Sequence, residues 1–187
     1  LKTIKQNKIK VISNAGGVNL DACKKALSNK AKKENINLKI ITVEGDDLSG
    51  IQKDLQKMSI KEIDSGKSLP ENLLSINAYL GAPGIKRALD QGADIVITGR
   101  CVDSALALGP LMYEFNWKEN EYDLLASGSL AGHIIECGAQ STGGNFTDWE
   151  IIDNFEDIGF PIVEVEENGE FIVTKPEGTG GIVNFGT

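Results

Sequence analysis

The sequence of 187 residues contains few of the residues that mark specialised classes of protein. It has three cysteines, one histidine and 6% aromatic residues. An odd number of widely spaced cysteines does not form a disulfide framework, so we expect a reducing, cytoplasmic environment. No apolar run is long enough to cross a bilayer, and no secretory signal pattern opens the sequence. We therefore expect no membrane partner.

Signatures of nucleotide and nucleic-acid binding are also missing. No glycine-containing turn has the full dinucleotide fingerprint, and no P-loop Lys-Ser/Thr pair occurs. Residues 1–40 carry ten lysines and two acids, whereas the remaining residues carry nine bases and 25 acids, for a net charge of -8. No aromatic residue lies among these lysines, and the acidic remainder would repel a polyanion. We expect no nucleic-acid partner.

What the chain does have is an alternation of short apolar runs and amphipathic segments. Strands are expected at 9–13, 38–43 and 94–98. Helices are expected after an N-cap at Asn19, through 48–58, over 81–91, over 105–108 with Pro110 close behind, and over 122–138. This order predicts an α/β fold with a mostly parallel, doubly wound sheet.

The pattern changes near residue 145. Residues 162–166 and 170–174 alternate apolar and polar side chains around Asn168-Gly169, which predicts a hairpin. We therefore divide the chain into a ligand-binding α/β region at 1–145 and a β-rich C-terminal extension at 146–187. The final segment resembles an interrupted strand, so we expect this sequence to be a piece of a longer protein.

The segment 94–110 carries the densest group of chemically active side chains. Arg100, Cys101, Asp103 and Ser104 supply a cation, a thiol, a carboxylate and a hydroxyl just after a buried strand. Ligands of α/β sheets bind at the carboxyl ends of strands, so we predict that Arg100 and Ser104 bind substrate and that Asp103 is catalytic. Alternatively, Asp103 or Ser104 only caps the next helix, and Arg100 only pairs with a surface acid.

Two other strands end in polar turns on the same edge. Asn14, Gly16 and Gly17 follow the first strand, and backbone N–H groups in such a turn suit an anion. Alternatively, these glycines only permit unusual backbone angles. The second strand ends in three carboxylates that would repel an anion or hold a hard divalent cation: Glu44, Asp46 and Asp47.

A second candidate cluster lies on the helix at 122–138. His133 precedes Cys137 by four residues, so the two side chains share a helix face; Glu136 and Gln140 lie beside them. An imidazole beside a thiol is the minimum for a nucleophilic pair and supplies a general base. We predict catalytic roles for His133, Glu136 and Cys137 and a binding role for Gln140. The alternative is an ordinary histidine beside an inert thiol.

A third candidate is the glycine-rich loop after the hairpin. Lys175, Gly178 and Gly180 would form a cradle for a phosphate or carboxylate, although turns of this kind also occur between strands without any ligand.

Several longer motifs occur in order along nearly the whole chain: VISNAGGVN (11–19), VEGDDL (43–48), INAYLGA (76–82), DIVITGR (94–100), VDSALALGPL (102–111), LAGHIIECGAQSTGG (130–144), DIGFPIVEV (157–165) and TKPEGTGG (174–181). Together they resemble the acyclic terpene utilisation AtuA family. The resemblance implies a role in catabolism of citronellol- and geraniol-like terpenoids through branched acyl-CoA thioesters. The resemblance does not assign established catalytic residues to this sequence. Asn77, inside the third motif, joins the predicted substrate-binding residues.

We therefore expect a catabolic enzyme whose small-molecule substrate is a branched or carboxylated CoA thioester. One reaction that the resemblance implies is lyase cleavage of a 3-hydroxy-3-methylglutaryl-like thioester, which needs a base and a cation for the developing enolate. His133 would be the base and Arg100 would hold a carboxylate. The alternative is a non-catalytic binding or assembly subunit, and in either case we expect a homo-oligomer.

Overall fold

The central strand of the molecule is buried at every residue. In the computed structural model, which describes residues 1–187, this strand is β3 (Ile95–Thr98), and it lies between β1 (Val11–Ser13) and β2 (Ile40–Val43). Both pairings are parallel, with Val11 and Ile40 opposite Ile95. The apolar run at 95–97 forms the middle of the sheet because both of its faces are covered.

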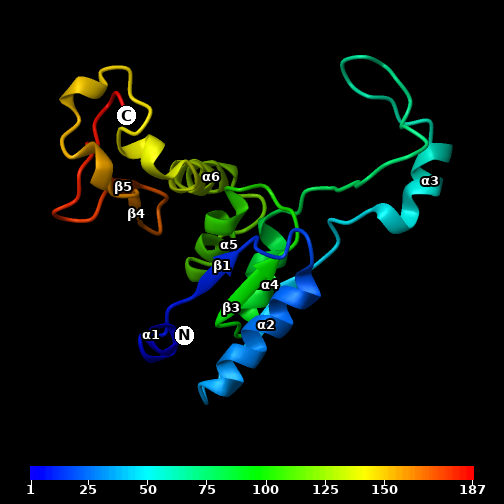
Figure 1. Ribbon diagram of the computed structural model, residues 1–187, viewed down its shortest axis with the longest axis horizontal. Coiled ribbons are helices and arrows are strands. Elements are labelled where there is room, and N and C mark those ends of the chain that lie inside the picture. Colours follow the sequence, from blue (N-terminus) through cyan, green and yellow to red (C-terminus); the bar gives the residue numbers. More distant parts are fainter.

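Six α-helices and an antiparallel hairpin complete the fold (Figure 1). The helices are α1 (Lys2–Gln6), α2 (Leu20–Lys33), α3 (Gln52–Lys57), α4 (Ala82–Asp90), α5 (Ala105–Glu114) and α6 (Tyr122–Glu136). The hairpin consists of β4 (Ile162–Val165) and β5 (Phe171–Thr174), and short 3₁₀ turns lie at Ser49–Ile51, Gly138–Thr142, Trp149–Ile151 and Phe155–Asp157. None of the helices has the length and apolar character that a bilayer crossing requires.

The mixed α/β class and the parallel arrangement of its three strands are confirmed. The Asn19 side chain accepts a hydrogen bond of 2.9 Å from the N–H of Ala22, so the predicted N-cap of α2 is confirmed as well. The hairpin around Asn168-Gly169 is present, and Gly169 adopts a φ of 86° at the turn. The doubly wound arrangement and the separate C-terminal extension stay predictions.

The helix expected over 105–108 is present as α5, and it is longer than its apolar pattern indicated because it includes Pro110. Helix α5 continues through this residue to Glu114. Proline has no N–H to donate to the Leu106 carbonyl, which weakens the helix locally. However, α5 packs between α4 and α6 and buries Ala105, Gly109 and Met112, and this tertiary burial outweighs the local loss.

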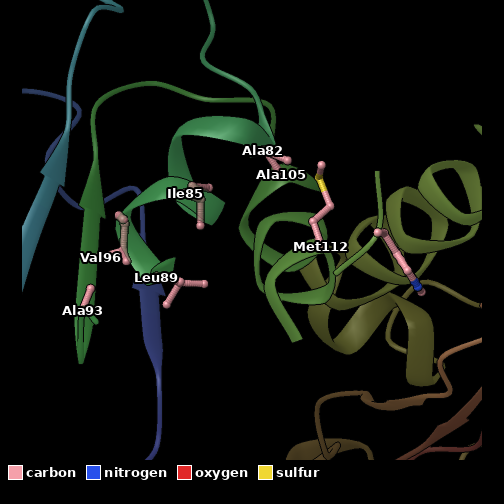
Figure 2. Packing of buried hydrophobic residues seen from close by; sticks show 9 residues of the cluster. Ala82, Ile85, Leu89, Ala93, Val96, Ala105 and Met112 are labelled. Carbon is pink, nitrogen blue, oxygen red and sulfur yellow. The ribbon is translucent and has the colours of Figure 1, made fainter. Parts of the chain in front are cut away.

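The apolar core lies between the sheet, α4 and α5 (Figure 2). Ile85 and Leu89 of α4 are almost completely buried between Val96 of the sheet and α5. The two helices approach closely at Gly109, where an added Cβ would lie 2.6 Å from two carbon atoms of Ile85. Only glycine allows this close approach of the two helices.

The hairpin packs on α6 through two side chains that bond to its turn. Trp117, just before α6, donates from Nε1 to the Glu167 carbonyl at 2.9 Å, and the Ser127 hydroxyl donates to the Gly169 carbonyl. Val165 of β4 also contacts the core cluster. None of the three cysteines is in a disulfide, in line with the expectation from their spacing.

The segment between residues 49 and 75 extends away from the sheet (Figure 1). It exposes five large apolar side chains: Ile51, Met58, Ile60, Ile63 and Leu74. The accessible surface of the whole chain is 12211 Å². A compact monomer of this mass exposes about 8,700 Å², so much of the surface of this chain is free to contact other molecules.

The close packing at Gly109 predicts a large stability difference between two glycine-to-alanine variants. Gly109→Ala should lower the free energy of unfolding by about 1–3 kcal/mol because the new methyl group overlaps Ile85. Gly50→Ala is the control, since nothing lies within 4 Å of its added Cβ. Urea denaturation of both variants measures the effect, and equal midpoints would contradict this account of the α4–α5 contact.

Candidate functional site

The three polar strand-end turns meet at the carboxyl edge of the parallel sheet. They line a cavity of about 730 Å³ together with the start of α2, and a smaller neighbouring cavity of about 230 Å³. Gly17 and Arg100 line both. This edge is the place at which α/β sheets bind ligands.

The buried carboxylate of Asp46 holds the edge together. Only 7% of Asp46 is exposed, and its Oδ2 atom accepts hydrogen bonds from the backbone N–H of Arg100 at 2.9 Å and from Asn77 Nδ2 at 3.1 Å. An added Cβ at Gly99 would lie 1.8 Å from Asp46 Oδ1, so the carboxylate fits only because residue 99 is glycine. Asp46 thereby joins the end of β2, the end of β3 and the segment around Asn77.

The side chain of Arg100 is exposed and forms no ion pair. Its Nη2 atom donates to the Tyr79 hydroxyl at 3.0 Å, and its guanidinium lies 5.3 Å from the centre of the Tyr79 ring. The hydroxyl, with smaller contributions from the charges of Asp46 and Asp103, raises the pKa of Arg100, so the cation is permanent. The alternative that Arg100 only neutralises a surface acid does not fit this geometry.

The turn after β1 presents unpaired backbone donors to the larger cavity. The N–H groups of Gly16, Val18, Asn19, Leu20 and Asp21 form no hydrogen bond within the chain, and these residues line the cavity. Gly16 does not adopt a positive φ; an added Cβ there would lie 2.8 Å from the Thr98 carbonyl oxygen. The role of Gly16 is therefore close packing of the turn against β3, and the free donors beside it suit an anion.

Three apolar residues line the same cavity: Val18, Leu20 and Leu74. Val18 and Leu74 are fully exposed, and they come from the turn after β1 and from the end of the extended segment. Exposed apolar side chains that line a cavity beside a cation favour a ligand with both an anionic and an apolar part.

The acidic side of the cavity is formed by the turn after β2. Asp47 accepts hydrogen bonds from the hydroxyl and the backbone N–H of Ser49, which lower the pKa of Asp47. Glu44 accepts from the Thr42 hydroxyl at 3.1 Å. The oxygens of Glu44, Asp46 and Asp47 do not converge in one metal-binding group, and a cation held by them stays a prediction.

Asp103 lines the smaller cavity with Asn14 and Arg100. Asp103 is exposed, and neither Asp103 nor Ser104 caps α5 with its side chain, so the capping alternative does not describe this turn. The neighbouring Cys101 is buried, and burial raises the pKa of its thiol. Cys101 is therefore a poor nucleophile, and a catalytic role of Asp103 stays a prediction.

The helix cluster lies in a separate cavity of about 370 Å³. His133, Cys137 and Gln140 line it, and none of its lining residues belongs to the strand-end cavities. His133 Nδ1 lies 3.2 Å from a Glu136 oxygen, and this carboxylate is also 3.7 Å from the Cys137 sulfur. Partial burial, followed by the Glu136 charge, raises the pKa of Cys137. A catalytic Cys–His pair stays a prediction that this pattern does not favour.

The loop after the hairpin is held by internal contacts. Lys175 Nζ donates to the Thr179 carbonyl at 2.6 Å, and an added Cβ at Gly180 would lie 2.0 Å from the Asn154 carbonyl oxygen. Lys175, Gly178 and Gly180 line none of the three cavities above. Their predicted binding role gains no support from the arrangement.

Sequence reasoning did not include Tyr79, Val18 or Leu74 among the site residues. Tyr79 lies in the same motif as Asn77, and an aromatic ring close to an arginine is a usable signal. Val18 follows a glycine turn and Leu74 stands in an irregular segment, so neither carries a periodic pattern that predicts its position.

The structure is that of a mixed α/β protein with polar cavities at the carboxyl ends of three parallel strands. The model of the acyclic terpene utilisation family protein AtuA matches residues 1–187. The chain belongs to this family, which is implicated in acyclic terpene utilisation and hence in catabolism. Comparison with curated proteins and with solved structures gave no significant match.

The bonding of Asp46 predicts that its removal destabilises the protein. Asp46→Ala leaves the Arg100 N–H and the Asn77 amide without their acceptor and should lower the free energy of unfolding by about 1–3 kcal/mol. Glu119→Ala is the control, because Glu119 is exposed and its carboxylate forms no hydrogen bond or ion pair; we expect a change within about 0.5 kcal/mol. Chemical denaturation measures the free energy of unfolding of both variants. A value for Asp46→Ala equal to that of the parent protein would contradict this role of Asp46.

Proposed function

We propose that the strand-end cavities bind a branched acyl thioester or a related carboxylated acid, and that the protein acts on this substrate in catabolism. One observation carries the proposal: the permanent cation of Arg100, five unpaired backbone N–H groups of residues 16–21 and the exposed apolar side chains of Val18 and Leu74 line the same cavity. A molecule with an anionic end and a short branched hydrocarbon part matches this combination.

Each part of such a ligand has a matching group. The carboxylate or phosphate end would bind Arg100 and the N–H groups of the turn after β1, where a helix N-terminus also favours negative charge. The hydrocarbon part would cover Val18 and Leu74. A substrate hydroxyl would donate to Glu44 or Asp47, which are acceptors that line the same cavity.

The reaction that we propose is a lyase-type cleavage, with Asp103 as the base. Asp103 would take the proton of a tertiary hydroxyl, the adjacent carbon–carbon bond would break to leave a ketone, and the enolate of the other product would take up a proton. Asp103 is favoured over His133 because it shares a cavity with Arg100, whereas His133 lies elsewhere. A divalent cation near Glu44 and Asp47 would stabilise the enolate charge.

Thermal unfolding in the presence of candidate ligands tests the substrate class. The ligands are 3-hydroxy-3-methylglutaryl-CoA, free CoA and 3-hydroxy-3-methylglutarate, each with and without Mg²⁺. A ligand at a hundred times its Kd stabilises the folded protein by about 2.7 kcal/mol, which raises the Tm by about 5–10 °C in a protein of this size. A flat response to all three ligands would contradict the proposed substrate class.

The anion-binding role predicts a large effect of Arg100→Ala on affinity. A charge-assisted hydrogen bond is worth about 1.5–3 kcal/mol, so the Kd of the ligand that binds should rise at least about tenfold. Arg87→Ala is a matched control, because Arg87 is the other arginine of the chain and lies exposed on α4, outside these cavities. Isothermal titration calorimetry measures both, and equal Kd values for the two variants would remove Arg100 from the site.

The catalytic role predicts that Asp103→Asn affects turnover and not binding. Loss of a general base lowers the rate about 10²–10⁴-fold, while the Kd of the substrate should stay within a factor of about three of the parent value because the isosteric amide keeps the shape of the cavity. Product formation in single-turnover experiments measures the rate. Unchanged turnover would end the assignment of Asp103 as the base.

A second candidate function is a binding or assembly subunit. The observation in its favour is the extended segment with exposed Ile63 and Leu74, together with the large accessible surface. An assembly role predicts a concentration-dependent mass in solution that falls when Ile63 is replaced by Lys. A catalytic role alone predicts the same mass for both proteins.

A further inference from the structure

The end of α6 brings three different metal-ligating side chains together. His133, Glu136 and Cys137 each offer one ligand atom, and these atoms all lie within 4.8 Å of one another. The three residues occupy positions i, i+3 and i+4, which share one helix face. They are distinct from the residues that line the strand-end cavities.

The spacing of these atoms fits a tetrahedral metal ion. With usual Zn–N, Zn–O and Zn–S bond lengths, tetrahedral geometry places a nitrogen and an oxygen about 3.3 Å apart and a sulfur and an oxygen about 3.6 Å apart. The structure has 3.2 Å between His133 Nδ1 and Glu136 Oε1, and 3.7 Å between Cys137 Sγ and the same oxygen. Two of the three distances between ligand atoms therefore agree with tetrahedral geometry to within about 0.2 Å.

The third distance, between His133 Nδ1 and Cys137 Sγ, can shorten when the exposed His133 side chain rotates. Sixty-seven per cent of the His133 side chain is exposed, so its ring can turn toward Cys137 without displacing core residues. His133 and Cys137 also line the cavity of about 370 Å³ described above, which gives an ion a route from solvent. The carbonyl end of α6 adds a partial negative charge at this position, and that charge favours a cation.

We propose that His133, Glu136 and Cys137 form a binding site for a single Zn²⁺ ion. A mixed nitrogen, oxygen and sulfur set in tetrahedral geometry is typical of zinc, whereas Mg²⁺ and Ca²⁺ prefer oxygen ligands alone. Three protein ligands leave the fourth tetrahedral position for water. The same three ligands explain why a lone histidine, an acid and a cysteine occur within five residues of the chain.

Titration of the purified chain with Co²⁺ tests the site directly, because Co²⁺ adopts the zinc geometry and reports on its ligands. We expect a charge-transfer band from a thiolate–cobalt bond and visible bands typical of tetrahedral cobalt, both saturating at one ion per chain. Zn²⁺ added afterwards should abolish these bands. No charge-transfer band at saturating Co²⁺ would overturn the proposal.

Variants of each ligand locate the site. Cys137→Ser should remove the charge-transfer band, and His133→Ala should weaken Zn²⁺ binding at least about tenfold in calorimetry. Cys23→Ser is the matched control, because Cys23 is a half-buried thiol on α2, and it should leave both signals unchanged. A band that persists in Cys137→Ser would overturn the proposal. All three changes lie on helix surfaces, and circular dichroism checks that each variant is folded.

The test is independent of the function proposed for the strand-end cavities. The Arg100→Ala protein should bind Co²⁺ like the parent protein, since the two sites share no residue. Reduced Co²⁺ binding in Arg100→Ala would contradict the separation of the sites.

Discussion

The carboxylate of Asp46 is the interaction on which the strand-end site depends. It is buried at the end of β2, and it holds the backbone of Arg100 at the end of β3 and the side chain of Asn77 in the connecting segment. A buried carboxylate is costly unless its oxygens receive hydrogen bonds, so these contacts specify one arrangement of the edge. The exposed groups around the cavity, including the Arg100 guanidinium, are placed by this buried acid.

The lining of the larger cavity combines three kinds of chemical group. It has the Arg100 cation and the unpaired N–H groups of the turn after β1, the carboxylates of Glu44 and Asp47, and the exposed apolar side chains of Val18 and Leu74. The function proposed above follows from this combination, because a ligand would be selected by charge and by apolar contact together.

Local patterns predicted much of this fold. The apolar run at 95–97 predicted the central strand, Asn19 its helix cap, and Asn168-Gly169 the hairpin, because each depends on neighbouring residues alone. The extension of α5 through Pro110 was not predicted, because it depends on the tertiary packing of the helix. The parallel order of the strands predicted that the three turns lie at one edge of the sheet. The separation of His133 from Arg100 was not predicted, because it depends on long-range packing that no short motif encodes.

Hydrogen–deuterium exchange in the presence of 3-hydroxy-3-methylglutaryl-CoA shows whether the ligand binds at the strand-end edge, as we propose. Binding there should slow exchange in residues 14–21 and 98–104, because the unpaired N–H groups of the first segment would bond to the ligand. Residues 133–147, around the other cavity, should exchange as in the free protein. Protection confined to 133–147, or no protection at a ligand concentration that raises the Tm, would contradict the account.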